Sequence, residues 1–295
     1  MSSYIITIGT LLVIQAIAVC GLNVIVGYAG QISLGHAAFF GIGAYAAALL
    51  STKAGLSFWM ALPLVMGISA LIGLLLGLPS IRVREDFLAI TTIGINFIIE
   101  ALFRYVQFFG GALGIGGIPR IVLFDVRLKG MAFFYLCALF LILVLLVCYW
   151  LTKSWASLAC YAIREEESAA STLGISPVRF KLLAFVLGTS MAGLAGSLYA
   201  HYMQFISPSD FSFPMSIAFL SMLVLGGMGT LWGPVVGTLI LGILPELFRP
   251  LVDYRMLFYT LLLLLVIRFQ PSGLLGEEST ARRLLATVLR GRLSR

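Results

Sequence analysis

Long apolar runs without a charged residue are the feature that most limits what this chain can fold into. The stretches Leu71–Leu78 and Leu136–Val147 are continuously apolar. Strands of a membrane β-barrel alternate polar and apolar residues, so these runs favour helices. Only 11% of the residues are charged and 61% are hydrophobic, whereas a soluble domain carries about a quarter charged residues. The sequence therefore predicts an all-α polytopic membrane protein.

A helix needs roughly 20 apolar residues to cross a bilayer, which leaves room for about 8–10 transmembrane helices. The first run begins close to Met1, with no basic stretch before it, and is long enough to span. We therefore expect a retained helix rather than a cleaved signal peptide. The expected spans are residues 4–26, 36–50, 58–78, 87–109, 131–151, 182–202, 215–225, 235–248 and 256–267.

Two glycine-rich breaks interrupt the apolar pattern, one near each end of the chain, at Gly27–Gly35 and Gly226–Pro234. Non-helical backbone at membrane depth survives only where protein buries it or where it lines a wet cavity. Paired interruptions of this kind point to a transport path. A tight cytoplasmic turn between two helices explains the spacing equally well.

The fourth span carries Thr92, Asn96, Glu100 and Arg104 at intervals of four residues, hence on one helix face. Glutamate four residues before arginine is the favourable order for an ion pair. This face either lines or gates a translocation route, or it holds helices together through a self-neutralising pair. The candidate path residues are Gln31, Ser33, His36, Asn96, Glu100, Arg104, Gly226, Gly227 and Gly229.

Small residues predict where helices pack closely, because backbone approach drives helix association in lipid. They recur every fourth residue in the sixth span and again in the third. We expect His36 to be a satisfied hydrogen-bonding residue and His201, at the outer end of the sixth span, to face water. The packing residues are Ala184, Gly188, Ala192, Gly196 and Ala200, with Ser69, Gly73 and Gly77.

The four cysteines show no CxxC pairing. Cys137 and Cys148 share one expected helix, where they lie roughly 16 Å apart, too far for a disulfide. We interpret all four cysteines as small apolar packing residues, and two histidines so far apart predict no metal site.

Lysine and arginine near the span ends predict the orientation. The basic tail 277–295 and the loop at about 152–181 are placed in the cytoplasm, with the N-terminus outside. The outer loop 110–130 still carries Arg120, Arg127 and Lys129. The expected excess of cations on the cytoplasmic side is therefore an excess in number, not a complete separation. The tail is expected either to lie on anionic headgroups or to be disordered.

Sequence signatures of catalysis are missing. There is no GxSxG nucleophile elbow, no HExxH zinc motif and no GxxxxGK[ST] phosphate loop. We therefore expect neither an enzyme nor a cofactor, and the chain does not hydrolyse ATP itself. Energy for transport must come from a partner or from an ion gradient.

The cytoplasmic loop predicts a docking element. Its first part suits a short amphipathic helix rich in Ala, Leu and Glu, with Gly174 as a C-terminal stop and Pro177 just beyond. Three consecutive acids on a helix with an apolar face, placed at the cytoplasmic surface, suit contact with a partner.

The loop Ile163–Gly174 resembles the ATPase-binding loop of LivM-type permeases, which belong to bacterial ABC importers for branched-chain amino acids. The general loop pattern is Glu-Ala-Ala followed by a Gly four residues later; Ala169, Ala170 and Gly174 match it, while Ser168 stands at the Glu position. The candidate coupling residues are Arg164, Glu165, Glu166, Glu167, Ala169, Ala170 and Gly174.

Further stretches are similar to the same family, namely Gly21–Tyr45, Arg84–Leu88, Gly114–Pro119, Leu225–Pro234 and Leu244–Gly276. The resemblance thus covers residues 1–276, which we expect to form a single transmembrane permease domain. It excludes the tail 277–295. Urea and amide importers have similar permeases, so the motifs specify the family better than the solute.

The resemblance implies an ABC importer permease fold in the bacterial inner membrane, working by alternating access. The implied partners are a homologous LivH-type permease, two cytoplasmic ATPase subunits, a periplasmic solute-binding protein and the lipid bilayer, without nucleic acid. Branched-chain amino acids are the implied solutes, and urea or short amides are the alternative. A self-sufficient channel or ion-coupled carrier using Glu100 is a competing class, but the acidic docking loop favours the permease.

Overall fold

A computed structural model describes residues 2–81, 85–123, 126–247, 264, 268 and 273–276 of this chain. The α-helices are α1 Ser2–Leu22, α2 His36–Thr52, α3 Phe58–Ile81, α4 Glu85–Tyr105, α5 Met131–Lys153, α6 Trp155–Glu165, α7 Glu167–Thr172, α8 Pro177–Met203, α9 Phe213–Gly226 and α10 Gly233–Leu247. A π-helical segment, η1 (Asn23–Tyr28), continues α1, and short 3₁₀ turns are η2 Gln107–Phe109, η3 Gly111–Leu113 and η4 Pro208–Phe211.

The strands are short and lie at the ends of helices. The strand β1 (Ile115–Gly116) pairs antiparallel with β4 (Phe205–Ile206), which joins the segment after α4 to the end of α8. The strands β2 (Val122–Leu123) and β3 (Val126–Arg127) form a second antiparallel pair. These ladders tie connecting segments to the bundle rather than forming a sheet core.

Among the described residues, six helical segments are long and apolar enough to cross a membrane, and α2 and α10 are shorter apolar helices. The prediction of an all-α polytopic membrane protein is therefore confirmed. The expected span 256–267, apart from Leu264, and the tail 277–295 lie outside the described residues.

Two boundaries differ from the sequence prediction. The fourth span was predicted too long, because α4 ends at Tyr105 and the apolar residues after it form η2. Gly110, Gly111 and Gly114 follow with positive φ, which stops a right-handed helix. The sixth span begins earlier than expected, with Pro177 in the first turn of α8, where proline has no hydrogen bond to lose.

The helix α8 lies at the centre of the bundle and packs against α1, α2 and α3. A Cβ added to Gly196 would lie 2.0 Å from the backbone oxygen of Phe40 in α2, and one added to Gly43 would lie 2.4 Å from Gly193 Cα. Only glycine permits such backbone contact. The predicted small-residue interfaces are thereby confirmed.

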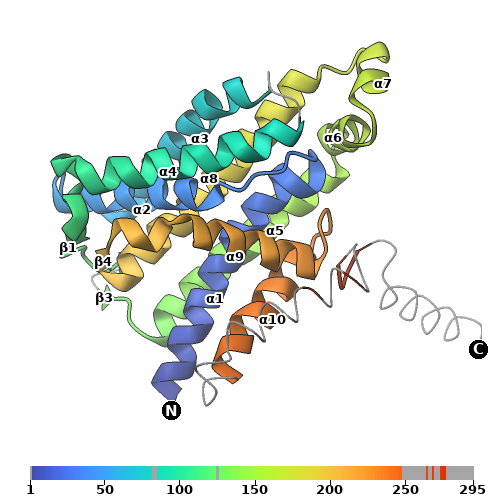
Figure 1. Ribbon diagram of the computed structural model, residues 1–295. Helices are drawn as coiled ribbons and strands as arrows, with labels where there is room; N and C mark the ends of the chain where they lie inside the picture. Colours follow the sequence, from blue (N-terminus) through green and yellow to red (C-terminus); the bar gives the residue numbers. More distant parts are fainter. Residues whose placement is uncertain are drawn as a thin grey trace, which may run out of the picture.

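All four cysteines are buried and free, which fits their interpretation as packing residues. His201 corrects another expectation. It is 1% exposed, and its Nε2 lies 3.0 Å from Ser51 Oγ while its Nδ1 lies 2.8 Å from the Ser197 oxygen. The prediction that His201 faces water was wrong, because α2 and α3 cover the end of α8 (Figure 1) and Phe58 packs on the imidazole ring.

The bundle has two distinct ends (Figure 1). The helices α6 and α7 lie at one end, and the strands β1, β3 and β4 lie at the other, together with the start of α1. We call these the α6–α7 end and the strand end.

Candidate functional site

The helix α6 presents a polar face to the bundle through Tyr161 and Arg164, which are three residues apart and so lie on one side of the helix. Arg164 Nη1 donates a hydrogen bond to the backbone oxygen of Gly27, in the first glycine break. Tyr161 Oη donates to the backbone oxygen of Gly229, in the second break, at 2.9 Å. One helix face therefore holds both breaks.

The two breaks also contact each other, although they are about 200 residues apart in the chain. Asn23 Oδ1 accepts from the Gly229 N–H at 2.8 Å, and Asn23 Nδ2 donates to the Thr230 oxygen at 2.9 Å. A Cβ on Gly27 would lie 2.5 Å from Gly229 N, so this contact needs glycine. The sequence reasoning missed Asn23, Tyr161 and Thr230. A polar Asn inside an apolar span was the signal that could have found the first.

A short C-terminal segment, residues 273–276, secures the second break. Leu274 N donates to the Leu225 oxygen at 2.9 Å, and Leu275 N donates to the Gly226 oxygen at 3.0 Å. Gly227 has a φ of +117°, a conformation that side chains rarely adopt. The second break is thus a compact turn between α9 and α10.

The first break runs back into the bundle. His36, at the start of α2, places its Nε2 2.9 Å from the backbone oxygen of Ala18. Ala18 precedes the end of η1 at Tyr28 by ten residues, or about 15 Å along a helix axis. The non-helical segment between η1 and α2 therefore re-enters the helix bundle, where protein must satisfy its backbone.

Hydroxyl groups of neighbouring helices bind the backbone of this segment. Leu34 N donates to Thr92 Oγ1 at 3.0 Å, and Ala37 N donates to Ser216 Oγ at 2.9 Å. Ser216 Oγ in turn donates to Asn96 Oδ1 at 2.9 Å. Thr92 and Asn96 are fully buried, so this half of the predicted polar face of α4 fixes the first break.

The other half of that face behaves differently. Arg104 Nη2 and Glu100 Oε1 lie 2.8 Å apart, which confirms the predicted ion pair. The side chains are 46% and 15% exposed, respectively, so the pair lies toward the surface, away from the buried Thr92 and Asn96. The predicted face therefore does not act as one continuous stripe.

Four buried polar atoms around the first break have no hydrogen-bond partner within the described part of the chain. They are Tyr28 Oη, Gln31 Nε2, Ser33 Oγ and His36 Nδ1. Buried polar groups are almost always paired. These atoms are therefore free to bind water or a polar solute, and Gln31, Ser33 and His36 are the predicted path residues that the structure brings together there.

The predicted coupling loop forms two helices rather than one. Glu166 has an extended backbone, with φ −155° and ψ 105°, and separates α6 from α7. Glu167 Oε2 pairs with Lys181 Nζ at 2.6 Å, which fastens α7 to α8. Ala170 is 2% exposed, and Gly174 has a φ of +83° in the turn after α7.

The outer surface of this helix pair is apolar and acidic. Trp155, Leu158 and Leu173 are 65%, 66% and 80% exposed, and Glu165 and Glu166 are exposed beside them. Large exposed apolar side chains among charges are typical of a protein interface.

The model of the family described as "Branched-chain amino acid transport system / permease component" matches residues 4–267. The chain belongs to this branched-chain amino acid permease family. It is 37% identical to the high-affinity branched-chain amino acid transport system permease protein LivM of Salmonella typhimurium, over 91% of this chain and 69% of the relative. The LivM protein of Escherichia coli matches equally.

A second kind of permease is similar to part of this chain. The LivH protein of Escherichia coli is 35% identical over 126 residues, which is 42% of this chain and 41% of the relative. No solved structure matches this chain.

Proposed function

We propose that this chain is the transmembrane permease subunit of an ATP-driven ABC importer, which carries branched-chain amino acids into the cytoplasm by alternating access. The observation that carries the proposal is the contact of one helix face, on α6, with both glycine breaks. The similarity to LivM permeases over most of the chain supports the solute class.

In this proposal, α6 and α7 form the docking surface for a cytoplasmic ATPase subunit. The partner would contact the exposed side of these helices, which carries Glu165, Glu166, Glu167 and Ala169. The buried Ala170 would pack α7 against the bundle, and Gly174 would form the turn after α7. The chain itself has no ATP-binding motif, so two partner ATPases would hydrolyse ATP. The alternating charges and apolar groups on this surface support a protein partner rather than a lipid one.

Movement of α6 would reach the membrane segments through two hydrogen bonds. Arg164 holds the carbonyl of Gly27, and Tyr161 holds that of Gly229. A shift of α6 would therefore displace both breaks together, and with them the adjoining ends of α1 and α9. A non-helical segment yields more easily than a continuous helix, because fewer backbone hydrogen bonds must break.

The solute path would pass the first break, where Gln31, Ser33 and His36 offer unpartnered polar atoms. A homologous LivH-type permease would complete the path, and a periplasmic solute-binding protein would deliver the solute at the strand end. The α6–α7 end would then face the cytoplasm, with the N-terminus outside and the C-terminus inside the bacterial inner membrane.

Reconstitution tests the proposal. The chain would be placed in liposomes alone, or with its LivH-type permease, ATPases and binding protein, and uptake of labelled leucine measured. We expect ATP-dependent uptake only from the full assembly, with unlabelled isoleucine and valine as competitors and urea and acetamide without effect. Uptake by the chain alone, driven by a proton gradient and lost in Glu100→Gln, would identify a carrier instead. Competition by urea or acetamide would reassign the solute class.

A further inference from the structure

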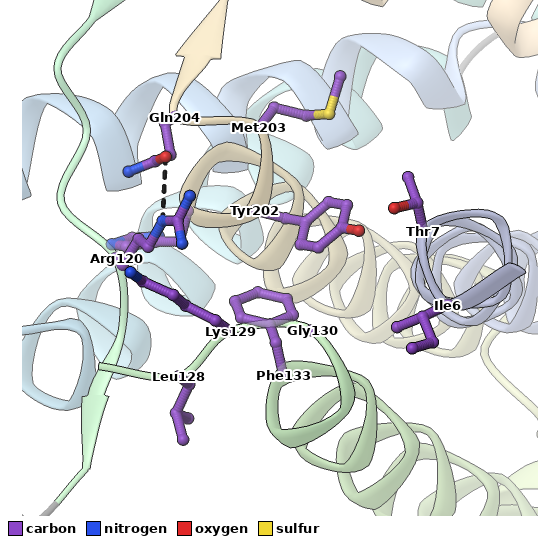
Figure 2. Close-up of a pocket in the computed structure, with 11 residues that line it drawn as sticks. Ile6, Thr7, Arg120, Leu128, Lys129, Gly130, Phe133, Tyr202, Met203 and Gln204 are labelled. Carbon is purple, nitrogen blue, oxygen red and sulfur yellow. Dashed lines mark hydrogen bonds between the residues drawn. The ribbon is translucent and has the colours of Figure 1, made fainter. Parts of the chain in front are cut away.

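A hollow of 380 Å³ opens at the strand end of the bundle, where α1, α5 and α8 approach one another. Figure 2 shows its residues: Arg120 and Lys129 lie close together beside Gln204, and Ile6 and Thr7 of α1 lie across from Tyr202 and Phe133. It is separate from the glycine breaks, which are held at the α6–α7 end.

The rim of this hollow is strongly basic on the side formed by Arg120 and Lys129. Arg120 Nε donates to Gln204 Oε1 at 3.1 Å, which fixes the guanidinium at the rim. A neighbouring hollow of 540 Å³ shares Arg120, Lys129 and Gln204 and adds Arg127. Three cations thus gather within two adjoining hollows, and such a cluster attracts an anion.

No carboxylate within the described residues pairs with these cations. Two acids described toward this end have other partners: Asp210 accepts a hydrogen bond from Ser207 N at 2.8 Å in a capping box, and Glu100 pairs with Arg104. Asp125 lies outside the described residues. The positive charge at the rim is therefore not neutralised by the residues described around it.

The rest of the hollow is lined by residues of membrane-spanning helices, where the polar Thr7 and His201 lie beside apolar side chains and rings. Ile6 lies in the second turn of α1, Phe133 in the first turn of α5 and Tyr202 in the last turn of α8. The rings of Phe133 and Tyr202 pack with centroids 5.0 Å apart. The hollow therefore combines a cationic rim with apolar side chains and rings from the ends of three membrane-spanning helices.

We propose that this hollow binds an anionic phospholipid, with its phosphate at Arg120 and Lys129 and the start of an acyl chain along Ile6 and Tyr202. A basic pocket between transmembrane helices is the usual kind of site for an acidic headgroup. An acidic loop of a soluble protein would fit the rim but would leave Ile6 and the rings at the helix ends without an apolar partner. Bound lipid would also explain why Arg120, Arg127 and Lys129 lie on the outer side of the membrane in the proposed orientation, where the positive-inside rule expects few cations.

Native mass spectrometry of the purified full chain in detergent tests the proposal, with phosphatidylglycerol as probe and phosphatidylcholine as the zwitterionic comparison. Each cation near a headgroup contributes about fivefold in affinity. We expect Lys129→Gln to weaken phosphatidylglycerol retention about fivefold, and the double variant Arg120→Gln, Lys129→Gln about 25-fold. The control Arg179→Gln, an exposed cation of α8 near the other end, should retain the lipid like the wild type.

Each other outcome would overturn the proposal. Equal retention of phosphatidylglycerol by wild type and Lys129→Gln would show that the lipid does not bind at this hollow. Complete displacement of the lipid by millimolar glycerol phosphate, which has the headgroup but no acyl chains, would show a simple anion site. Unchanged lipid retention with lost binding of the periplasmic partner would assign the rim to a protein. Lys129 is exposed, so its variant is expected to fold, and its melting temperature checks this.

Discussion

At the scale of single residues, the most consequential contact is the hydrogen bond from Arg164 to the Gly27 carbonyl. A guanidinium keeps its charge at any pH and donates in a fixed geometry, so it can hold a carbonyl on a different helix rigidly. Gly30 supports this contact, because its φ of +70° lets the chain turn beneath the Arg164 side chain. The bond joins α6 to a membrane segment directly, without an intervening residue.

Arg164→Ala should therefore uncouple transport from ATP hydrolysis in the reconstituted assembly. A hydrogen bond from a charged donor contributes about 1.5–3 kcal/mol, so we expect leucine uptake per ATP hydrolysed to fall by about tenfold or more. Uptake and phosphate release are measured on the same liposomes.

Arg179→Ala, which removes another exposed arginine at the same end, provides the matched control and should keep the wild-type ratio. If Arg164→Ala lowered uptake and ATP hydrolysis in equal proportion, Arg164 would serve docking or folding rather than transmission.

At the scale of elements, α8 determines how closely the bundle packs. Its small residues meet those of three other helices, as where Gly193 lies against Gly43 of α2 and against Ser69 of α3. In lipid such backbone contact replaces the hydrophobic force that packs soluble helices. A substitution on this face should therefore cost far more than the same substitution on an open helix face.

Gly196→Val and Gly67→Val form a matched pair that tests this difference. Both glycines are helical, but the Gly196 Cβ would meet the Phe40 backbone at 2.0 Å, whereas nothing lies within 4 Å of a Cβ on Gly67. We expect Gly196→Val to cost about 3 kcal/mol or more, seen as a much lower melting temperature in detergent. Gly67→Val should melt within a few degrees of the wild type, and similar losses in both would refute the packing argument.

At the scale of the whole molecule, the structure separates two ends with different chemistry. The α6–α7 end carries acids, exposed apolar side chains and both glycine breaks. The strand end carries the basic hollows. Because helices cross the bundle from one end to the other (Figure 1), the two ends must face opposite sides of the membrane.

Single engineered cysteines give the sidedness directly, since the four native cysteines are buried. Leu113, at the strand end, is 85% exposed, and Leu173, after α7, is 80% exposed. We expect a membrane-impermeant maleimide to label Leu113→Cys in intact spheroplasts and Leu173→Cys only in inside-out vesicles. The opposite pattern would invert the proposed orientation and move the ATPase surface outside.

Part of this architecture could be predicted from the sequence. The apolar runs predicted α5, α3 and most of α1, because an apolar segment of about 20 residues is most stable as a membrane-spanning helix. The i+4 spacing of small residues located the packing face of α8, and the order of Glu100 and Arg104 predicted their ion pair. Each of these features depends on residues close together in the chain, where helix geometry alone sets the contact.

What the sequence by itself determined is therefore the fold class, most spans and the local pairs, since hydrophobic length and helix periodicity act locally. Only the tertiary structure decided that Thr92 and Asn96 hold the first break while Glu100 and Arg104 do not, and that His201 is buried beneath Phe58. It alone placed Asn23 beside Gly229 and put Tyr161 and Arg164 of α6 against both breaks. These contacts join residues far apart in the chain, and no local periodicity encodes which distant carbonyl an arginine will reach.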